Sequence, residues 1–266
     1  MEFDPKTIRK TILNMAYSGS TVHIGCAFSI VEILAVLYRN HLNYPNNDPQ
    51  SSSRDYLVLS KGHGVMAQYA CIHEKGWLED RDLDEYFSDG SLLKGLSDSR
   101  VRGLEATSGS LGHGLSIGVG MALGARLGRS SQKTFIVVGD GEINEGAIWE
   151  GLMFASHHCL KNLFVIVDEN GFQAMGRTND IIELGSIKTK FEAFGFEVLE
   201  VDGHSEDAIN DAIINLSAST SDQPKAIMAK TIKGKGVSFM EGNNAWHYTR
   251  LDANSYRRAL IEVGAT

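Results

Sequence analysis

Phe135-Ile-Val-Val138 leads directly into Gly139-Asp140-Gly141, and Leu163-Phe-Val-Ile-Val167 leads directly into Asp168-Glu169-Asn170. Short apolar runs that end in turn residues predict buried strands, and the sequence between these two runs predicts a helix. An Asp and an Asn thirty residues apart are therefore expected at the carboxyl ends of two neighbouring strands. This strand–helix–strand pattern decides the fold.

These polar side chains suit a magnesium ion. Mg²⁺ takes oxygen ligands, few of them from protein, and completes its octahedron with waters and phosphates. Asp140, Asn170 and a backbone carbonyl near Phe172, together with a diphosphate, would meet that need, while Gly139 and Gly141 let the backbone approach phosphate oxygens. A bare Gly-Asp-Gly fits an ordinary strand–turn–helix with an Asp cap equally well. The Asn at the end of the adjacent strand favours the metal.

The alternation of strands and helices continues along the chain. A helix is expected from Pro5, with Asp4 as its N-cap. Further strands are expected at 56–59, 197–201 and 225–230, further helices at 29–38, from 66, from 114, at 145–160, at 186–194 and from 205, and loops at 43–54, 88–106, 176–185 and 231–247. Such alternation predicts a doubly wound, mostly parallel α/β sheet with helices on both faces, in one domain spanning 1–266. Ligands of such sheets bind at the carboxyl ends of the strands.

Composition narrows the class of protein. The 266 residues carry a net charge of −8 without a dense Lys/Arg run, which argues against nucleic acid as a partner. No apolar run approaches the length of a membrane span, and the N-terminus lacks a secretory signal, so a cytoplasmic location is expected. Cys26, Cys71 and Cys159 have neither zinc nor disulfide spacing and lie in apolar contexts, so structural thiols are expected.

Four histidines are candidates for chemistry. His23, His63 and His113 lie in Gly-rich turns or at a helix start, and His247 lies near the end of a long loop. A lone His in a turn more often caps or hydrogen-bonds than catalyses. Imidazole nevertheless shuttles protons and binds sugar hydroxyls or phosphate near neutral pH, and several at strand ends favour function.

Other features have plainer interpretations. Glu145 suits the first turn of a helix, where the dipole favours an acid. His157-His158 is expected in mid-helix, exposed or packed. Lys233-Gly-Lys-Gly236 lacks the full pattern of a phosphate-binding P-loop. The helix from Gly114 also contains Gly118, Gly120 and Gly124, which weaken it by roughly 1 kcal/mol each, so close packing on a neighbouring helix or on another protomer is expected.

Together the motifs resemble the transketolase family of thiamine diphosphate enzymes, from about residue 5 to 260. The Gly-Asp-Gly and Asp-Glu-Asn pair resembles the cofactor motif of that family. The other similar blocks are Ser20–Gly25 (with Thr-Val before His23), Ser60-Lys-Gly-His63, Thr107-Ser-Gly-Ser-Leu-Gly-His-Gly114, Gly139-Asp-Gly-Glu-Ile-Asn-Glu-Gly146, and Lys230–Gly236 through Trp246-His247.

The resemblance implies roles for particular residues. Asp140, Asn170 and the Phe172 carbonyl would hold Mg²⁺, or Ca²⁺ or Mn²⁺ in its place. His23, His63 and His247 would bind the donor sugar and move protons, and Glu145 would join a carboxylate chain between two active sites at a dimer interface. Thiamine diphosphate would contact His63, Gly109, Ser110, Leu111, Gly139, Asp140, Gly141, Glu142, Asn170, Ala174 and His247.

This sequence departs from the family in its loop and in its length. Gly95-Leu96-Ser97 replaces a Gly-His-Pro triplet whose His would touch the donor, His113 stands where Gln is common, and Ala174 is small for its position. Full transketolases continue into a pyrimidine-binding domain that carries the cofactor-activating glutamate. The resemblance therefore implies the N-terminal subunit of a split transketolase, pairing with a C-terminal subunit and self-associating as α2β2.

Three functions remain open. The first is ketol transfer from a ketose phosphate to an aldose, as part of a two-chain enzyme. The second keeps the cofactor but uses a modified or non-phosphorylated donor, as Leu96 suggests. The third is a non-catalytic regulatory partner, which retention of the candidate site residues disfavours. A nicotinamide site is excluded because no Gly-x-Gly-x-x-Gly follows the first strand.

Overall fold

The computed structural model describes residues 2–19 and 21–264, so Ser20 of the first block lies outside the described residues. Within these residues, five parallel strands form a central sheet in the spatial order β2-β3-β4-β8-β7. The strands are β2 (Tyr56–Leu59), β3 (Thr134–Gly139), β4 (Leu163–Glu169), β7 (Glu197–Asp202) and β8 (Lys225–Lys230). Gly139 pairs with Asp168 in the register, so the two motifs meet at one edge. The predicted doubly wound fold is confirmed.

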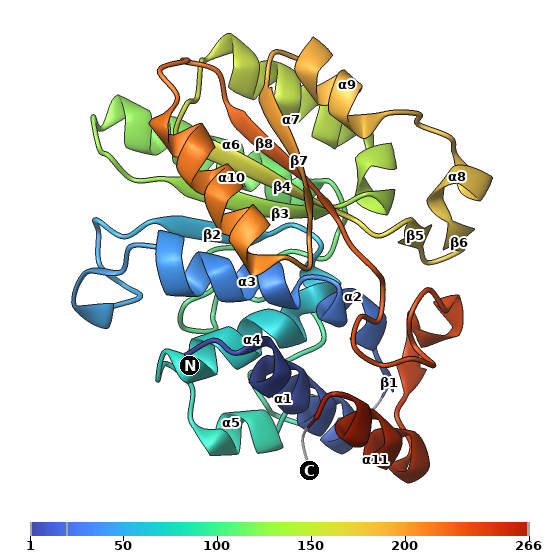
Figure 1. Cartoon of the computed structure of the whole chain (residues 1–266). Coiled ribbons are helices and arrows are strands. Elements are labelled where there is room, and N and C mark those ends of the chain that lie inside the picture. Colours follow the sequence, from blue (N-terminus) through green and yellow to red (C-terminus); the bar gives the residue numbers. More distant parts are fainter. Residues whose placement is uncertain (1, 20, 265–266) are drawn as a thin grey trace.

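Helices cover both faces of the sheet (Figure 1). Buried side chains of alternate sheet residues divide between two apolar cores, one on each face. The first core lies under α1 (Pro5–Ser18), α2 (Ile24–Phe28), α3 (Val31–Val36), the π-helical turn Leu37–His41, α4 (Val65–Glu74) and α10 (Glu206–Ala218). The second lies under α6 (His113–Leu127), α7 (Gly146–His157) and α9 (Ile187–Ala193).

Several smaller elements lie outside the central sheet and the helices that cover it. They are β1 (Thr21–Val22) paired with β9 (Thr249–Arg250), β5 (Phe172–Gln173) paired with β6 (Gly176–Arg177), α5 (Asp80–Asp84), α8 (Thr178–Ile181), α11 (Ala253–Glu262), and single 3-10 turns at Pro45–Asn47, Gly62–Gly64, Gly141–Asn144 and Asn244–Trp246. The segment 176–185, predicted as a loop, therefore contains β6 and α8, and the segment 80–84, for which no element was predicted, forms α5. Elements of four or five residues carry too little periodicity to be recognised from sequence.

Local signals explain the start of α1 and the glycines of α6. Asp4 caps α1 by accepting a hydrogen bond from the Thr7 amide at 2.9 Å, with Pro5 at the first position, as predicted. A Cβ on Gly118 would lie 2.4 Å from Ile136 of β3, so Gly118 packs on the sheet. The prediction had been packing on a helix or on another protomer. Gly120 and Gly124 face open space.

The end of α7 corrects two predictions. His157 is the last residue of α7 and His158 follows it, so the pair is not in mid-helix. Cys159 adopts φ of 46° and is exposed, unlike the buried Cys26 and Cys71. The Leu160 amide donates to the Ala155 carbonyl at 3.1 Å, which closes the helix in a Schellman-type turn. This turn places the Leu160 side chain in the apolar core.

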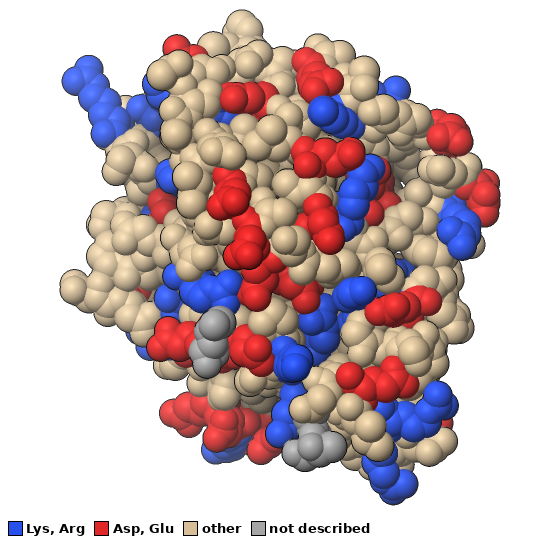
Figure 2. Space-filling view, in the orientation of Figure 1, with Lys and Arg blue, Asp and Glu red and all other residues tan. Residues whose placement is uncertain are grey.

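Charge is mixed over the surface. On the face in Figure 2, acidic and basic side chains lie interspersed. Among the described residues, no helix combines the length and the apolar character needed to cross a membrane.

Candidate active site

A cleft of about 340 Å³ opens at the carboxyl edge of the sheet. It brings together most of the predicted site residues: His63, Leu111, Gly139, Asp140, Gly141, Glu142, Glu145, Asn170, Phe172, Ala174 and His247. Gly109 and Ser110 lie just outside it, in the loop before α6, and His23 lies beside its histidines. Glu145 is exposed at the start of α7.

Asp140 and Asn170 present oxygens from adjacent strand ends. Asp140 accepts hydrogen bonds from the Gly141 and Gly171 amides at 2.8 and 2.6 Å. The Asn170 amide group donates to Asp168 at 2.9 Å, and its oxygen accepts from the Phe172 amide at 3.0 Å. Because a carboxylate cannot donate, Asp168 determines which end of the Asn170 amide is the oxygen.

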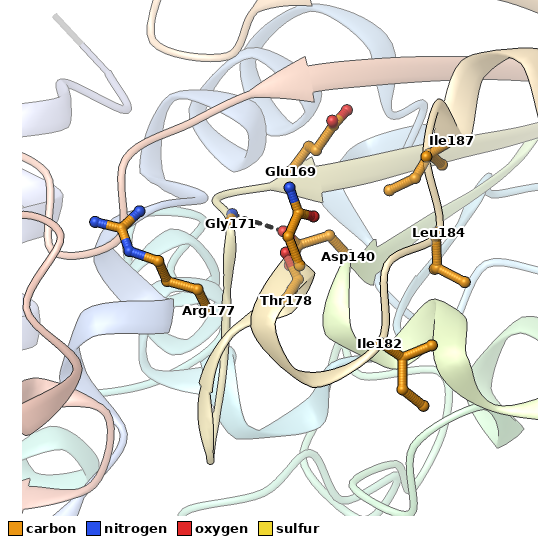
Figure 3. Close-up of a pocket in the computed structure, with 10 residues that line it drawn as sticks. Asp140, Glu169, Gly171, Arg177, Thr178, Ile182, Leu184 and Ile187 are labelled. Carbon is orange, nitrogen blue, oxygen red and sulfur yellow. Dashed lines mark hydrogen bonds between the residues drawn. The ribbon is translucent and has the colours of Figure 1, made fainter.

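The electrostatics of Asp140 favour a cation. Burial and the nearby Asp168 carboxylate raise its pKa to about 7, although the two backbone amides and Lys61 oppose the shift. A cation beside it would restore the ionised form. Figure 3 shows the same carboxylate, held by Gly171, at the wall of a second pocket of about 250 Å³. Among the described residues, no group of three or more His, Cys, Asp or Glu side chains could hold a metal, so a metal here needs amide or carbonyl oxygens.

Two buried polar groups in the cleft lack hydrogen-bond partners. They are the Asn144 side-chain oxygen and the Gln173 side-chain nitrogen, and both residues line the cleft. Buried polar atoms are nearly always paired in folded proteins. Gly141 is needed beside them, since a Cβ there would lie 2.6 Å from Gln173.

Three imidazoles gather at one side of the cleft. The His23 ring lies 5.1 Å from that of His63 and 5.3 Å from that of His247. Burial, followed by the charges of Lys233 and Lys61, lowers the pKa of His23 to about 4, and burial with Lys233 lowers that of His247 to about 3. Burial also holds the pKa of His63 well below its usual value. All three rings are therefore neutral at pH 7.

Two buried lysines were missed as functional candidates. Lys61, 2 % exposed, pairs with Asp168 and donates to the Cys26 carbonyl at 3.1 Å. Burial alone would raise the pKa of Asp168, but the charge of Lys61 holds that pKa below its ordinary range. Lys61 lies within a block that the sequence did highlight. Its partners Cys26 and Asp168 come from α2 and β4, far away in the sequence, so nothing local marked Lys61.

Lys233 is the second missed lysine. Its amine lies 2.7 Å from both the Asn244 side-chain oxygen and Nδ1 of His247. The contact makes Nδ1 the acceptor, so the His247 proton lies on Nε2. Burial, with the charge of Lys61, lowers the pKa of Lys233 to about 8. Lys233 begins the Gly/Lys-rich stretch that lacked a P-loop pattern. It nevertheless lines the cleft, as Lys61 does.

Glu142 connects three segments that line the cleft through hydrogen bonds. Its carboxylate accepts from the Ser60 hydroxyl at 2.5 Å and from the Gly112 and Gly139 amides at 2.8 and 3.2 Å. These partners come from the ends of β2 and β3 and from the loop before α6. Burial raises the pKa of Glu142 despite these bonds.

Comparison with known proteins decides the family. Residues 5–265 match the model described as "Transketolase, thiamine diphosphate binding domain". The chain belongs to the transketolase family. This membership confirms the thiamine diphosphate-binding domain and the transferase class that the sequence motifs predicted.

Relatives of this transketolase chain include short subunits and long enzymes. It is 36% identical over 99% of its length to an apulose-4-phosphate transketolase subunit of Phocaeicola vulgatus, covering 93% of that protein. It is 37% identical over 99% of its length to a 6-deoxy-6-sulfo-D-fructose transketolase subunit of Clostridium sp. (strain MSTE9), covering 96% of it. It superposes on Campylobacter jejuni transketolase with a TM-score of 0.91 at 30% identity, covering 99% of this chain but only 42% of that enzyme.

The departures from the family motif occupy distinct places in this transketolase chain. Leu96, 45% exposed, packs on Gly109, where a Cβ would lie 2.9 Å from its methyl groups. His113 is exposed at the start of α6, with its Nδ1 3.3 Å from the Leu111 carbonyl. Ala174 lines the cleft, and its carbonyl accepts from the Asn244 side chain at 3.0 Å.

Proposed function

We propose that this chain is the thiamine diphosphate-binding subunit of a two-chain transketolase that transfers a two-carbon ketol unit from a ketose to an aldose. The observation that carries the proposal is the pairing of Asp140 and Asn170 at adjacent strand ends, in a cleft that also contains two buried lysines. An oxygen pair beside buried lysines suits a metal-bound diphosphate better than it suits a neutral ligand.

Each group at the strand ends has a role in holding the cofactor. Asp140, the Asn170 oxygen and the Phe172 carbonyl would hold Mg²⁺, or Ca²⁺ or Mn²⁺. Lys233 and His63 line the same cleft and would contact the diphosphate. When bound, thiamine diphosphate supplies the nucleophilic carbon that opens the donor beside its carbonyl. The remaining predicted contacts, Gly109, Ser110, Leu111, Gly139, Gly141, Glu142 and Ala174, complete the cofactor cradle.

The three neutral imidazoles handle the sugar. A neutral ring can accept a proton from a donor hydroxyl and return it later, whereas a charged ring could only donate. His247 differs, because Lys233 occupies its Nδ1 and leaves an N–H at Nε2, so this ring can give a proton to a donor oxygen and take it back at the same atom. Its roles, and those of His23 and His63, are binding of donor hydroxyls and proton transfer during cleavage and release.

A second polypeptide completes the enzyme in this proposal. Two relatives that this chain covers almost fully are named as transketolase subunits. We propose that residues 1–266 form one diphosphate-binding domain, that a C-terminal subunit brings the pyrimidine-binding domain and its activating glutamate, and that Glu145 lies where the chains associate as α2β2. A cytoplasmic location, and action without nucleic acid or membrane, belong to the same proposal.

The donor itself has two candidates. A common ketose phosphate is the first, and a modified sugar is the second. The names of the relatives point to apulose 4-phosphate and 6-deoxy-6-sulfo-D-fructose as the substrates of those proteins. The apolar Leu96, which lines a pocket together with His23, favours a modified donor here.

Reconstitution tests the proposal. The purified chain, its candidate partner and their mixture are assayed for ketol transfer with thiamine diphosphate and Mg²⁺, and size-exclusion chromatography reports assembly. We expect turnover from the mixture only. Robust turnover by the 266-residue chain alone would refute the two-chain arrangement. A mixture that assembles but neither binds the cofactor nor turns over would instead support a non-catalytic regulatory role.

A further inference from the structure

Asn244 joins two segments that line the cleft. It belongs to the 3-10 turn Asn244–Trp246, in the long loop after β8. Its side-chain oxygen accepts a hydrogen bond from the Lys233 amine at 2.7 Å, and its side-chain nitrogen donates to the Ala174 carbonyl at 3.0 Å. Because an ammonium group can only donate and a carbonyl can only accept, these two partners determine the orientation of the Asn244 amide.

The 3-10 turn directs Asn244 and His247 at the same lysine. Residues three apart in a 3-10 helix lie on the same side, and the His247 amide donates to the Asn244 carbonyl at 3.0 Å. Both side chains reach the Lys233 amine, each at 2.7 Å. The stem of Lys233 packs closely against Gly25, where a Cβ would lie 3.2 Å from the lysine Cγ. A protonated lysine has three N–H donors, so these contacts leave one for a ligand in the cleft.

The second bond of Asn244 holds a hairpin. Ala174 lies between β5 and β6, two residues after Phe172, whose carbonyl is the proposed third metal ligand. The centre of the Phe172 ring also lies 5.5 Å from the Lys233 amine. The two strands pair through only two residues each, and an isolated hairpin is at best marginally stable in water. The bond from Asn244 therefore helps to hold the hairpin at the cleft.

We propose that Asn244 is a positioning residue of the cofactor site, which fixes both the Lys233 amine and the β5–β6 hairpin. Lys233 and Ala174 line the cleft, and Asn244 acts on a ligand there through these two partners. This inference rests on the proposed function, because the diphosphate is the ligand that Lys233 would contact.

The free chain tests this geometry without the cofactor. NMR gives the nitrogen chemical shift of His247 Nδ1, which depends on the N–H that Lys233 donates. It also gives the exchange rate of the Thr178 amide, which donates to the Gly171 carbonyl at 3.0 Å beside the hairpin. Asn244→Leu keeps the size of the side chain and removes both bonds. We expect the shift to move and the exchange to become about fivefold faster, as one lost hydrogen bond predicts.

Two aspartate variants separate the bonds. Asn244→Asp keeps an oxygen for Lys233 but cannot donate to the Ala174 carbonyl, so only the exchange rate should change. The matched control is Asn243→Asp, which adds the same charge one residue away, on a side chain that bonds to backbone groups of its own loop. Neither readout should change in this control. Unchanged shift and exchange in Asn244→Leu, or changes of the same size in Asn243→Asp, would overturn the inference.

Calorimetry of the assembled complex then measures the affinity for thiamine diphosphate with Mg²⁺. We expect Asn244→Leu to weaken binding about tenfold, because it removes a hydrogen bond to a charged group. In a Lys233→Met background the same change should weaken binding less, because that bond is already gone. An equal loss in both backgrounds would overturn the positioning of Lys233. Absence of cofactor binding by the wild-type complex would instead overturn the proposed function, while the spectra of the free chain would still decide whether Asn244 fixes its two partners.

Discussion

Replacing Lys61 with Met should destabilise the chain by about 3–5 kcal/mol, the cost of breaking a buried ion pair on one side. Lys61 is 2 % exposed and its partner Asp168 is fully buried, so water cannot replace the lost ammonium. Asp168 would keep hydrogen bonds from Ser29, Asn170 and Thr231, which places the loss nearer the lower end of the range. Methionine fills nearly the same volume, so a cavity adds little.

The matched control is Lys225→Met. Lys225 is equally buried, but its partner Glu197 is 35% exposed. Water can therefore solvate the Glu197 carboxylate when the lysine is removed, and the loss should be about 1 kcal/mol or less. Both variants are measured by urea denaturation of the purified chain, at two protein concentrations so that association is accounted for.

The pH dependence gives a second test of Lys61. In wild type, the depressed pKa of Asp168 contributes stability above about pH 4, and this is lost as the pH falls through the folded-state pKa. In Lys61→Met the unpaired buried carboxyl has a raised pKa, so its penalty grows as the pH rises from about 4. The two proteins should converge at low pH. A loss below about 1 kcal/mol, an equal loss in Lys225→Met, or a difference independent of pH would refute the reasoning.

Three further predictions concern the cleft. Asp140→Ala and Asn170→Ala should each abolish Mg²⁺-dependent thiamine diphosphate binding by the assembled complex in calorimetry, because each removes one of few oxygen ligands; near-wild-type affinity would contradict the metal assignment. Affinity for the cofactor should fall as the pH rises through about 8, where Lys233 loses its proton, and Lys233→Met should bind weakly without this dependence. In the free chain, NMR titration should find His23 and His247 neutral down to about pH 5. Because the same rings protonate near pH 6.5 in the unfolded chain, the folded chain should become less stable as the pH falls below about 6.5. Folded-state pKa values of about 6–7 would contradict the argument that burial lowers them.

The sequence by itself determined the five strands of the central sheet, the order of the motifs and the chemistry of the carboxyl edge. These features are local. An apolar run that ends in Gly139-Asp140-Gly141 predicts a strand followed by a turn, and this prediction needs no information about the rest of the fold. Parallel strands then bring Asp140 and Asn170 to the same edge, because adjacent strands share direction and register. The cap of α1 by Asp4 is equally local.

Only the tertiary structure decided which charges are buried together and which apolar surfaces face the cleft. Lys61 and Asp168 are 107 residues apart, and Lys233 meets His247 only because the loop after β8 folds back over the cleft. A pocket beside His23 combines Val22, Leu96 and Tyr248, which lie far apart in the sequence. Such contacts depend on how elements that are far apart in the sequence pack against each other. Periodicity and motif spacing report only local structure, so they do not predict which distant side chains meet.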